Sequence, residues 1–431
     1  MQSYIRIQLL SNIKTDCFLP EQSKSLKIGM SKKRILSIIL ACLAFFCMVH
    51  VKAQDTAFSQ PEMGLSSEDL TAKAEKGDTD AQYFLGTLYL SILEDGKNRQ
   101  KAVYWLQKAV EGGNVAAQLK LGIMYSFGVD IPKDEKKAVS LVMQSAEQGF
   151  PMAQFLLSCG YSEHEEDRQK YLRIKPQINE DVRYFFDMIL SLSSSMRKEG
   201  IVPDSQKAIS WLQKAADQGF VLAQDALANK YAKGIDVERD DAKAAYGLEK
   251  VAQQGSPYAQ SQLANQYANG QGVPRDFAKA VYWDQKAADQ NDVYAQANLG
   301  TAYYYGRGVT QNYEKAAYWY RKAAEQGFAA AQNDLAIVYM KGDGVPRNYQ
   351  KAFHWAKKAA QQGYPEAQLN LGLMYANGQG TKKNYLYAYV LLNHAAATVE
   401  SAREIRDRLE AKMTQKEIAK AQAMTIDDVL K

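Results

Sequence analysis

The chain has 431 residues, a formal net charge of +5 and 46% hydrophobic residues, enough to bury a substantial interior. Residues 1–53 hold eight Lys and Arg but only two acids, which leaves 45 basic and 46 acidic side chains in 54–431. The composition therefore excludes a disordered chain, and the near-neutral body lacks the basic surface of a nucleic-acid-binding protein.

An export signal is predicted at the N-terminus. Basic residues 32–34 precede an apolar run over 35–49, and small or apolar side chains precede a cleavage site after Ala53. We interpret 1–53 as an N-terminal extension and bacterial secretory signal peptide, with Met30 as the true start. The protein is then expected to be periplasmic or secreted. An uncleaved membrane anchor is the alternative, although the apolar run is short for a spanning helix.

Cleavage after Ala53 would leave Cys159 as the one cysteine of the mature chain. A lipoprotein signal ending at Cys42 fits poorly, because Leu40 is unfavourable just before the small residue. An exported chain with one thiol has no internal disulfide, so packing must stabilise it. We predict that Cys159 is a packed thiol, with a redox or intermolecular role as the alternative.

The dipeptide Ala-Gln recurs with a step of 36 residues, interrupted by one step of 70. A fixed period of this size indicates a solenoid of helical hairpins, an all-α fold. The long step predicts two units, the second a degenerate copy near 171–204, so about nine hairpins are expected over 77–394. The eight clear units start from Ala81, Ala117, Ala153, Ala223, Ala259, Ala295, Ala331 and Ala367.

Each unit is predicted to hold two helices. Counted from its alanine, small or apolar residues at +4, +8 and +11 share one face of the first helix, and the second half carries Lys-Ala at +20 and commonly Trp at +24. Glycine, or Asn291 in one unit, follows the second helices, at a position that requires a left-handed backbone conformation. The predicted N-caps of the second helices are Asn98, Asp134, Asp204, Asp240, Asp276, Asn312, Asn348 and Asn384.

This pattern resembles the Sel-one-like repeat (SLR), a relative of the tetratricopeptide repeat, over about 66–394 and most closely over 259–363. The resemblance implies an α/α superhelical solenoid that acts as a protein–protein adaptor, in envelope regulation or in contact with host proteins. Residues 54–76 and 395–431 would then be the N-terminal cap and the C-terminal capping helices.

The variable positions +2, +6 and +9 of the first helices are predicted to line a concave groove for a protein or peptide ligand. Asparagine side chains there can pair with a peptide group. These positions also vary in a solenoid with no ligand, and a glycan bound on tyrosines near Tyr303 is a further alternative. The candidate groove residues are Asn229, Asn265, Thr301, Tyr304, Asn333, Ile337, Leu369 and Leu373.

No catalytic, metal or cofactor site is predicted. Outside 1–53 the histidines are His164, His354 and His394, which fall in different units without metal-ligand spacing. The resemblance implies one alternative, because some cysteine-rich exported relatives carry penicillin-binding or β-lactamase labels. This sequence lacks the paired cysteines of that branch and a serine nucleophile with a basic partner.

The stretch YYYGRGV at 303–309 resembles a phosphate-binding loop in isolation. Its copies occur in other units without the lysine and Ser/Thr that such a loop needs, and the middle residue changes. We therefore predict a turn that ends one helix and leads to Asn312. Tyr303 is expected in the buried stripe, and Tyr304 in the groove with Tyr305 at its edge.

Overall fold

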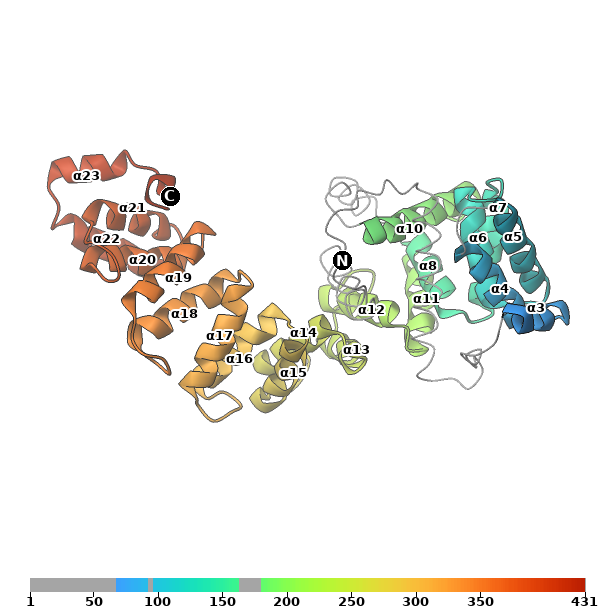
Figure 1. Ribbon diagram of the computed structural model, residues 1–431, viewed down its shortest axis with the longest axis horizontal. Helices are drawn as coiled ribbons and strands as arrows, with labels where there is room; N and C mark the ends of the chain where they lie inside the picture. Colours follow the sequence, from blue (N-terminus) through green and yellow to red (C-terminus); the bar gives the residue numbers. More distant parts are fainter. Residues whose placement is uncertain (1–66, 92–95, 163–179, 431) are drawn as a thin grey trace. The chain divides into compact units, whose positions relative to one another are not determined.

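The computed structural model describes residues 67–91, 96–162 and 180–430, so the predicted signal peptide lies outside the described residues. Helices and short connections make up this part of the chain, which confirms the all-α solenoid (Figure 1). Its contacts divide into two units, Met1–Gln254 and Gly255–Lys431, each described here by itself.

The described residues contain eight two-helix hairpins. In each hairpin the first helix packs on its partner, and within each unit the second helix packs on the first helix of the next hairpin. The pairs are α4 (Thr79–Ser91) with α5 (Gly96–Glu111), α6 (Val115–Phe127) with α7 (Glu135–Glu147), α8 (Pro151–Tyr161) with α11 (Ser205–Asp217), α12 (Val221–Lys233) with α13 (Asp241–Gln253), α14 (Pro257–Asn269) with α15 (Phe277–Asp289), α16 (Val293–Tyr305) with α17 (Tyr313–Glu325), α18 (Ala329–Lys341) with α19 (Tyr349–Gln361), and α20 (Pro365–Asn377) with α21 (Tyr385–Ala395).

Capping residues set the ends of the second helices as expected. The Asn312 side chain, for example, accepts a hydrogen bond from the Lys315 backbone N–H at 2.9 Å. Seven of the eight predicted caps act in this way; Asn98 instead lies inside α5, which begins two residues earlier. The residues predicted to end these helices have positive φ, including Asn291 at 69°.

The buried glutamine of the Ala-Gln dipeptide joins neighbouring helices. In α18, Gln332 donates to the Ala324 carbonyl of α17 at 3.1 Å and accepts from Gln362, the residue that follows α19, at 2.9 Å. Gln224 makes the same pair of bonds, with Ala216 and Gln254. The dipeptide thus recurs because a buried carboxamide needs partners, and two helix ends supply them.

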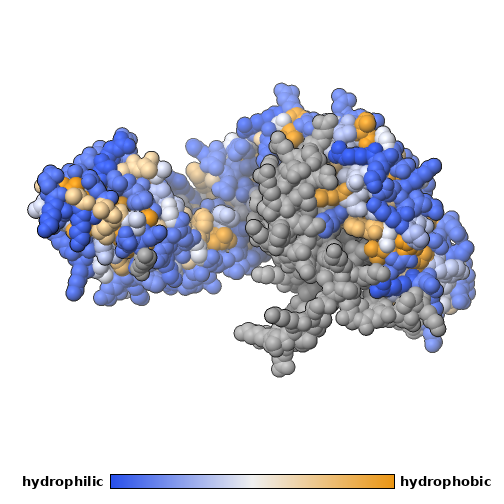
Figure 2. Space-filling view, turned by 90° about the horizontal axis from the view of Figure 1, so that it is seen from above, coloured by the Kyte–Doolittle hydropathy of each residue, from blue (hydrophilic) through white to orange (hydrophobic). Residues whose placement is uncertain are grey.

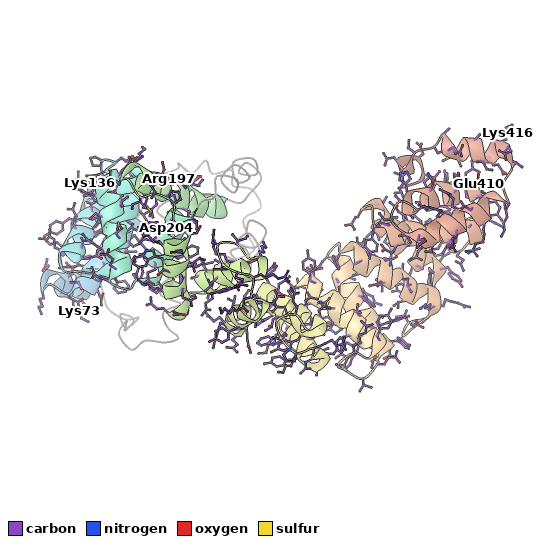
Figure 3. The ribbon with its side chains drawn as sticks, turned by 180° about the vertical axis from the view of Figure 1, so that it is seen from behind. Lys73, Lys136, Arg197, Asp204, Glu410 and Lys416 are labelled. Carbon is purple, nitrogen blue, oxygen red and sulfur yellow. The ribbon has the colours of Figure 1, made fainter. Side chains whose placement is uncertain are left out.

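Between the two helices of the third hairpin the chain carries an additional helix, α10 (Glu180–Lys198). α8 pairs directly with α11, and the Asp204 N–H donates to the Tyr161 carbonyl at 2.8 Å, as the equivalent Asp276 does to Tyr267. Figure 3 labels Asp204 at the start of α11. The described residues therefore hold eight hairpins rather than about nine, because α10 is an insertion within one unit.

Short helices cover both ends of the repeat array. α3 (Ser67–Glu75) packs on α4, and α22 (Glu400–Glu410) packs on α21. α23 (Gln415–Gln422) and α24 (Ile426–Leu430) also pack on α21, where Val429 and Leu430 are buried. These contacts shield the apolar face that the last repeat would otherwise leave exposed.

Candidate functional site

In the second unit the first helices lie next to one another along one face. α14 contacts α16 directly, and side chains of α16, α18 and α20 are hydrogen-bonded to one another or to the adjoining loop. The +6 position of these four helices is partly exposed in every case. We call these four residues the first-helix row: Asn265, Thr301, Ile337 and Leu373.

Thr301 and Tyr304 belong to a polar and aromatic cluster. The Tyr320 hydroxyl donates to Thr301 Oγ1 at 3.2 Å, while the Tyr304 hydroxyl donates to Asp343 Oδ2 at 2.7 Å. Lys341 Nζ donates to the same Tyr304 hydroxyl at 2.9 Å and lies 5.5 Å from its ring centroid. Burial raises the pKa of Tyr304, so the ring stays neutral and its hydroxyl is held between a cation and a carboxylate.

Asn333 is buried rather than exposed in the predicted groove. Only 4% of the residue is accessible, and its Oδ1 accepts a hydrogen bond from Asn370 Nδ2 of α20 at 2.8 Å. Leu369 is partly buried and packs against the core of this unit. Asn333 therefore joins α18 to α20 and is not available to a ligand, while Leu369 presents only part of its surface.

The two predicted groove asparagines differ in their hydrogen bonding. Asn229, in the first unit, donates to the Asp225 carbonyl of its own helix at 3.2 Å. Asn265, in the second unit, is partly exposed, and its carboxamide makes no hydrogen bond within the described part of the chain. Asn265 thus keeps its donor and acceptor available to a ligand.

In the first unit α10 covers the corresponding positions of α6 and α8. Leu119, Ile123 and Phe155 are each no more than 5% exposed and share one apolar cluster with Met188 and Leu192 of α10. A Cβ added at Gly160 would lie 2.2 Å from Met196 Sδ, so α10 approaches α8 closely. The predicted groove positions are therefore occupied here by the chain's own helix.

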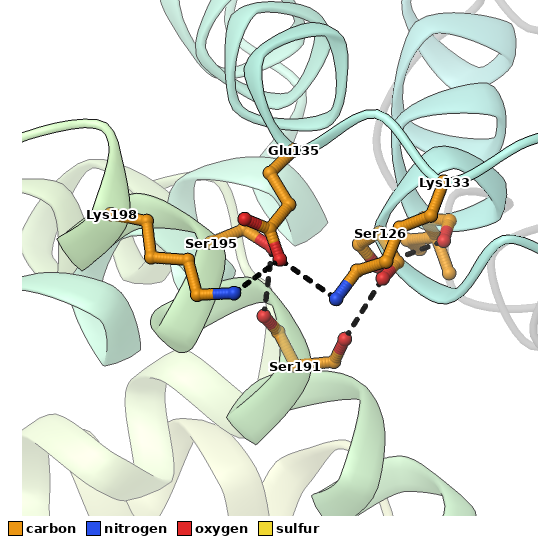
Figure 4. Close-up of polar contacts among 7 residues, drawn as sticks. Ser126, Lys133, Glu135, Ser191, Ser195 and Lys198 are labelled. Carbon is orange, nitrogen blue, oxygen red and sulfur yellow. Dashed lines mark hydrogen bonds and ion pairs between the residues drawn. The ribbon is translucent and has the colours of Figure 1, made fainter.

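Polar contacts hold the edge of α10 in place (Figure 4). The Ser191 hydroxyl donates to the Ser126 carbonyl of α6 at 3.3 Å. Lys198 Nζ donates to Glu135 Oε1 at 2.8 Å, and Lys133 lies 2.7 Å from the same oxygen. Because Lys198 is exposed, its ion pair with Glu135 orients α10 more than it stabilises it.

The groups that could do chemistry lie apart from one another and are at least partly buried. Burial raises the pKa of the Cys159 thiol to about 12, which leaves it a poor nucleophile at neutral pH. Burial also raises the pKa of Asp284 to about 8, while Asn298 donates to its Oδ1 at 3.2 Å. Among the described residues no group of His, Cys, Asp and Glu could hold a metal ion. None of these groups forms a nucleophile–base pair.

The face shown in Figure 2 is mainly hydrophilic, with small separate apolar areas. No helix in the described ranges is both long and apolar enough to cross a membrane.

Three solved structures illustrate the similarity, although their TM-scores are low. A Sel1 repeat protein from Oxalobacter formigenes is 27% identical, with a TM-score of 0.47, over 91% of this chain and 98% of its own. A protective antigen of uropathogenic Escherichia coli displaying an SLR fold is 26% identical, with a TM-score of 0.32, over 83% and 93%. An immunity protein, Pa5087, from Pseudomonas aeruginosa is 22% identical, with a TM-score of 0.30, over 45% and 74%. Among curated proteins none matches the chain.

The family comparison is more decisive. A family model of the Sel1 repeat matches residues 79–114, 115–150, 194–220, 221–256, 257–292, 293–328, 329–364 and 365–397. The third match covers the end of α10 and all of α11, consistent with a unit split by an insertion. Because the matches cover more than half of its length, the chain belongs to the Sel1 repeat family.

Proposed function

We propose that this protein is a non-enzymatic scaffold that binds an extended peptide segment of a partner protein along the first-helix row. Sel1 repeat proteins generally act as protein–protein interaction scaffolds and are typically non-catalytic. The observation that carries the proposal is the recurrence of one partly exposed side chain at +6 in each of α14, α16, α18 and α20. A peptide laid across the helices would meet these side chains in turn.

The chemistry of the row suits a peptide of mixed character. Asn265 offers a free donor and acceptor to a backbone amide, whereas Ile337 and Leu373 offer apolar contacts to side chains. Tyr304, held by Lys341 and Asp343, adds an aromatic surface next to Thr301. The first unit is a less suitable place, because α10 already covers its equivalent positions.

A photo-crosslinking experiment tests this site. We would place p-benzoylphenylalanine at residue 337, at residue 373, or as a control at Tyr318, which is 50% exposed on the second helix α17. Illumination of cells that make the protein should give the same partner adduct from 337 and 373 and none from 318. Ile337→Arg should reduce the adduct at 373 at least tenfold. Equal adducts from all three positions would argue against a specific groove.

Export is proposed as part of the same function, in the periplasm or outside the cell, with roles in envelope regulation or host interaction. The support is the basic run at 32–34 followed by the apolar run at 35–49. Mass spectrometry of the protein from separated cell fractions should identify an N-terminal peptide beginning at Gln54. An N-terminus at residue 1 or 30 in the cytoplasmic fraction would contradict export while leaving the groove proposal intact.

The non-enzymatic assignment has its own test. The purified protein should hydrolyse the β-lactam nitrocefin no faster than buffer, because the described residues contain no activated serine. Turnover well above buffer would overturn the assignment and favour the β-lactamase-like alternative.

A further inference from the structure

Gly247 interrupts a recurring feature of the second helices. It occupies the +24 position, where every other hairpin carries a large apolar side chain. The helix α13 therefore lacks a side chain that its neighbours possess. The equivalent residues are Trp105, Leu141, Trp211, Trp283, Trp319, Trp355 and Leu391.

A pocket of about 570 Å³ lies beside Gly247, within the first unit. The helices α11, α12 and α13 form its walls. Ala216, Leu227 and Ala228 form the apolar floor and are each less than 10% exposed. Tyr246, 64% exposed, and Lys250 lie at the rim.

The walls of this pocket match those that hold an indole elsewhere in the chain. Trp319 packs on an apolar cluster that includes Ala288 of the preceding second helix and Leu299 of its own first helix. The residues two repeats earlier are Ala216 and Leu227, and both line the pocket. The repeat thus keeps the walls of a tryptophan site but supplies no tryptophan.

The rim supplies a cation in the position that covers the indole in other repeats. Lys214 Nζ lies 4.1 Å from the Trp211 ring centroid, and Lys358 Nζ lies 4.8 Å from that of Trp355. Lys250 occupies the equivalent position but lies 5.0 Å from the Tyr246 ring instead. Lys250 could therefore form a cation–π contact with an aromatic ring in the pocket as well as with Tyr246.

Carboxamides surround the opening and favour a peptide over a free hydrocarbon. Gln213 donates to Asp217, and Gln254 donates to Gln224 and to the Gly219 carbonyl. These side chains can exchange such bonds for bonds to a peptide backbone. We propose that the pocket binds a tryptophan side chain of a partner polypeptide, in a site separate from the first-helix row.

Fluorine NMR on the full chain tests the pocket with 5-fluoroindole and with N-acetyl-5-fluoro-tryptophanamide as probes. Saturable line broadening is expected for both, with a Kd on the order of 1 mM for so small a ligand. Gly247→Trp should abolish it, and Gly247→Leu should weaken it at least tenfold. Both substitutions introduce residues that other repeats carry at this position, and a Cβ at 247 would meet the Ala228 Cβ at 3.1 Å and the Gln224 carbonyl oxygen at 3.3 Å, so the neighbours must shift by a few tenths of an ångström.

The matched control is Trp319→Gly, which removes the indole from an equivalent site in the second unit and should create new probe binding. Broadening that is unchanged in both Gly247 variants, or absent from the wild type, would overturn the proposal. Binding of 5-fluoroindole without the blocked tryptophan would also overturn it, because the site would then exclude a polypeptide. If Gly247→Trp fails to fold, as judged by circular dichroism, Gly247→Leu decides the outcome.

Discussion

At the scale of single residues, the second glycine of YYYGRGV has a role beyond its turn. Gly306 and Gly308 both have positive φ, as a turn requires, and this agrees with the interpretation of the stretch as a connection. A Cβ at Gly308 would in addition lie 2.2 Å from the Phe277 carbonyl oxygen of the preceding hairpin. Gly344 and Gly380 make the same approach, to Tyr313 and Tyr349. Glycine recurs there because neighbouring repeats touch through the backbone.

Asp284 lies where four other hairpins carry leucine, and it should make stability depend on pH. Its pKa is raised to about 8 by burial, whereas the unfolded chain ionises near the ordinary value of about 4. The stability that the protonated Asp284 carboxyl gives the folded state, relative to the ionised form, is therefore fully present below pH 4 and is lost as the pH rises toward 8. Its slope is at most about 1.4 kcal/mol per pH unit.

We expect Asp284→Asn to remove much of this dependence. In urea unfolding between pH 5 and pH 8, the free energy of unfolding should fall less steeply for the variant than for the wild type. Some slope should persist, because burial also raises the pKa of Asp334, to about 6. Asp289→Asn, on the exposed side of the same helix, is the control and should leave the slope unchanged. Parallel curves for all three proteins would refute the argument.

At the scale of helices, the prediction from sequence succeeded where local chemistry repeats. Asp276 caps α15, and Asn291 adopts the left-handed conformation that follows it, because these interactions involve residues close in sequence. The face of the first helices followed from the helical period, and Asn265 and Ile337 are indeed partly exposed. Asn333 could not be placed in this way, because its burial depends on Asn370 of another helix.

The position of α10 could not be derived from periodicity, since its sequence lacks the repeat pattern. One signal was present: two full units would give a step of 72 residues, and the observed step is 70. The extra 34 residues lie between Tyr161 and Asp204, which keep the hydrogen bond typical of a closed hairpin. The cover that α10 forms over α6 and α8 is a long-range contact, which spacing does not encode.

Replacing residues 162–203 with the eight residues 268–275 should test whether α10 is a removable insertion. The α8–α11 hairpin should close as in the other repeats, so far-ultraviolet circular dichroism should keep its helical form. Leu119, Ile123 and Phe155 would become exposed, at a cost of roughly 1.5–3 kcal/mol each as an upper bound. A lower melting temperature and stronger bis-ANS fluorescence are therefore expected.

The same splice with Ile123→Gln is the control, and it should bind less dye than the splice alone. If the helical signal collapses after the splice, α10 is an essential part of the unit rather than an insertion. Unchanged dye binding and melting would show that α10 does not cover this surface.

At the scale of the whole molecule, stability should behave as a sum of repeats and of the interfaces between neighbours. Within each unit the second helices pack on the first helix of the next hairpin, and backbone contacts such as that of Gly308 occur at these interfaces. A change at one interface should therefore weaken the nearest hairpins most. Distant hairpins should open with nearly their original free energy.

Gly308→Ala tests this expectation. The substitution places a side chain at a φ of 73° and against the Phe277 carbonyl, which should destabilise the local repeats by at least about 2 kcal/mol. Hydrogen exchange followed by mass spectrometry should show faster exchange in peptides from α14 to α19 and unchanged exchange in α4 to α7. Gly306→Ala is the control for positive φ, because its added Cβ would come no closer than 3.3 Å to any neighbouring atom, whereas the Cβ at Gly308 would clash with backbone. Equal acceleration of exchange in every peptide would mean that the chain unfolds as one cooperative body. A weakened interface can destabilise distant hairpins only when the interface free energy between neighbours is larger than the intrinsic stability of a single hairpin.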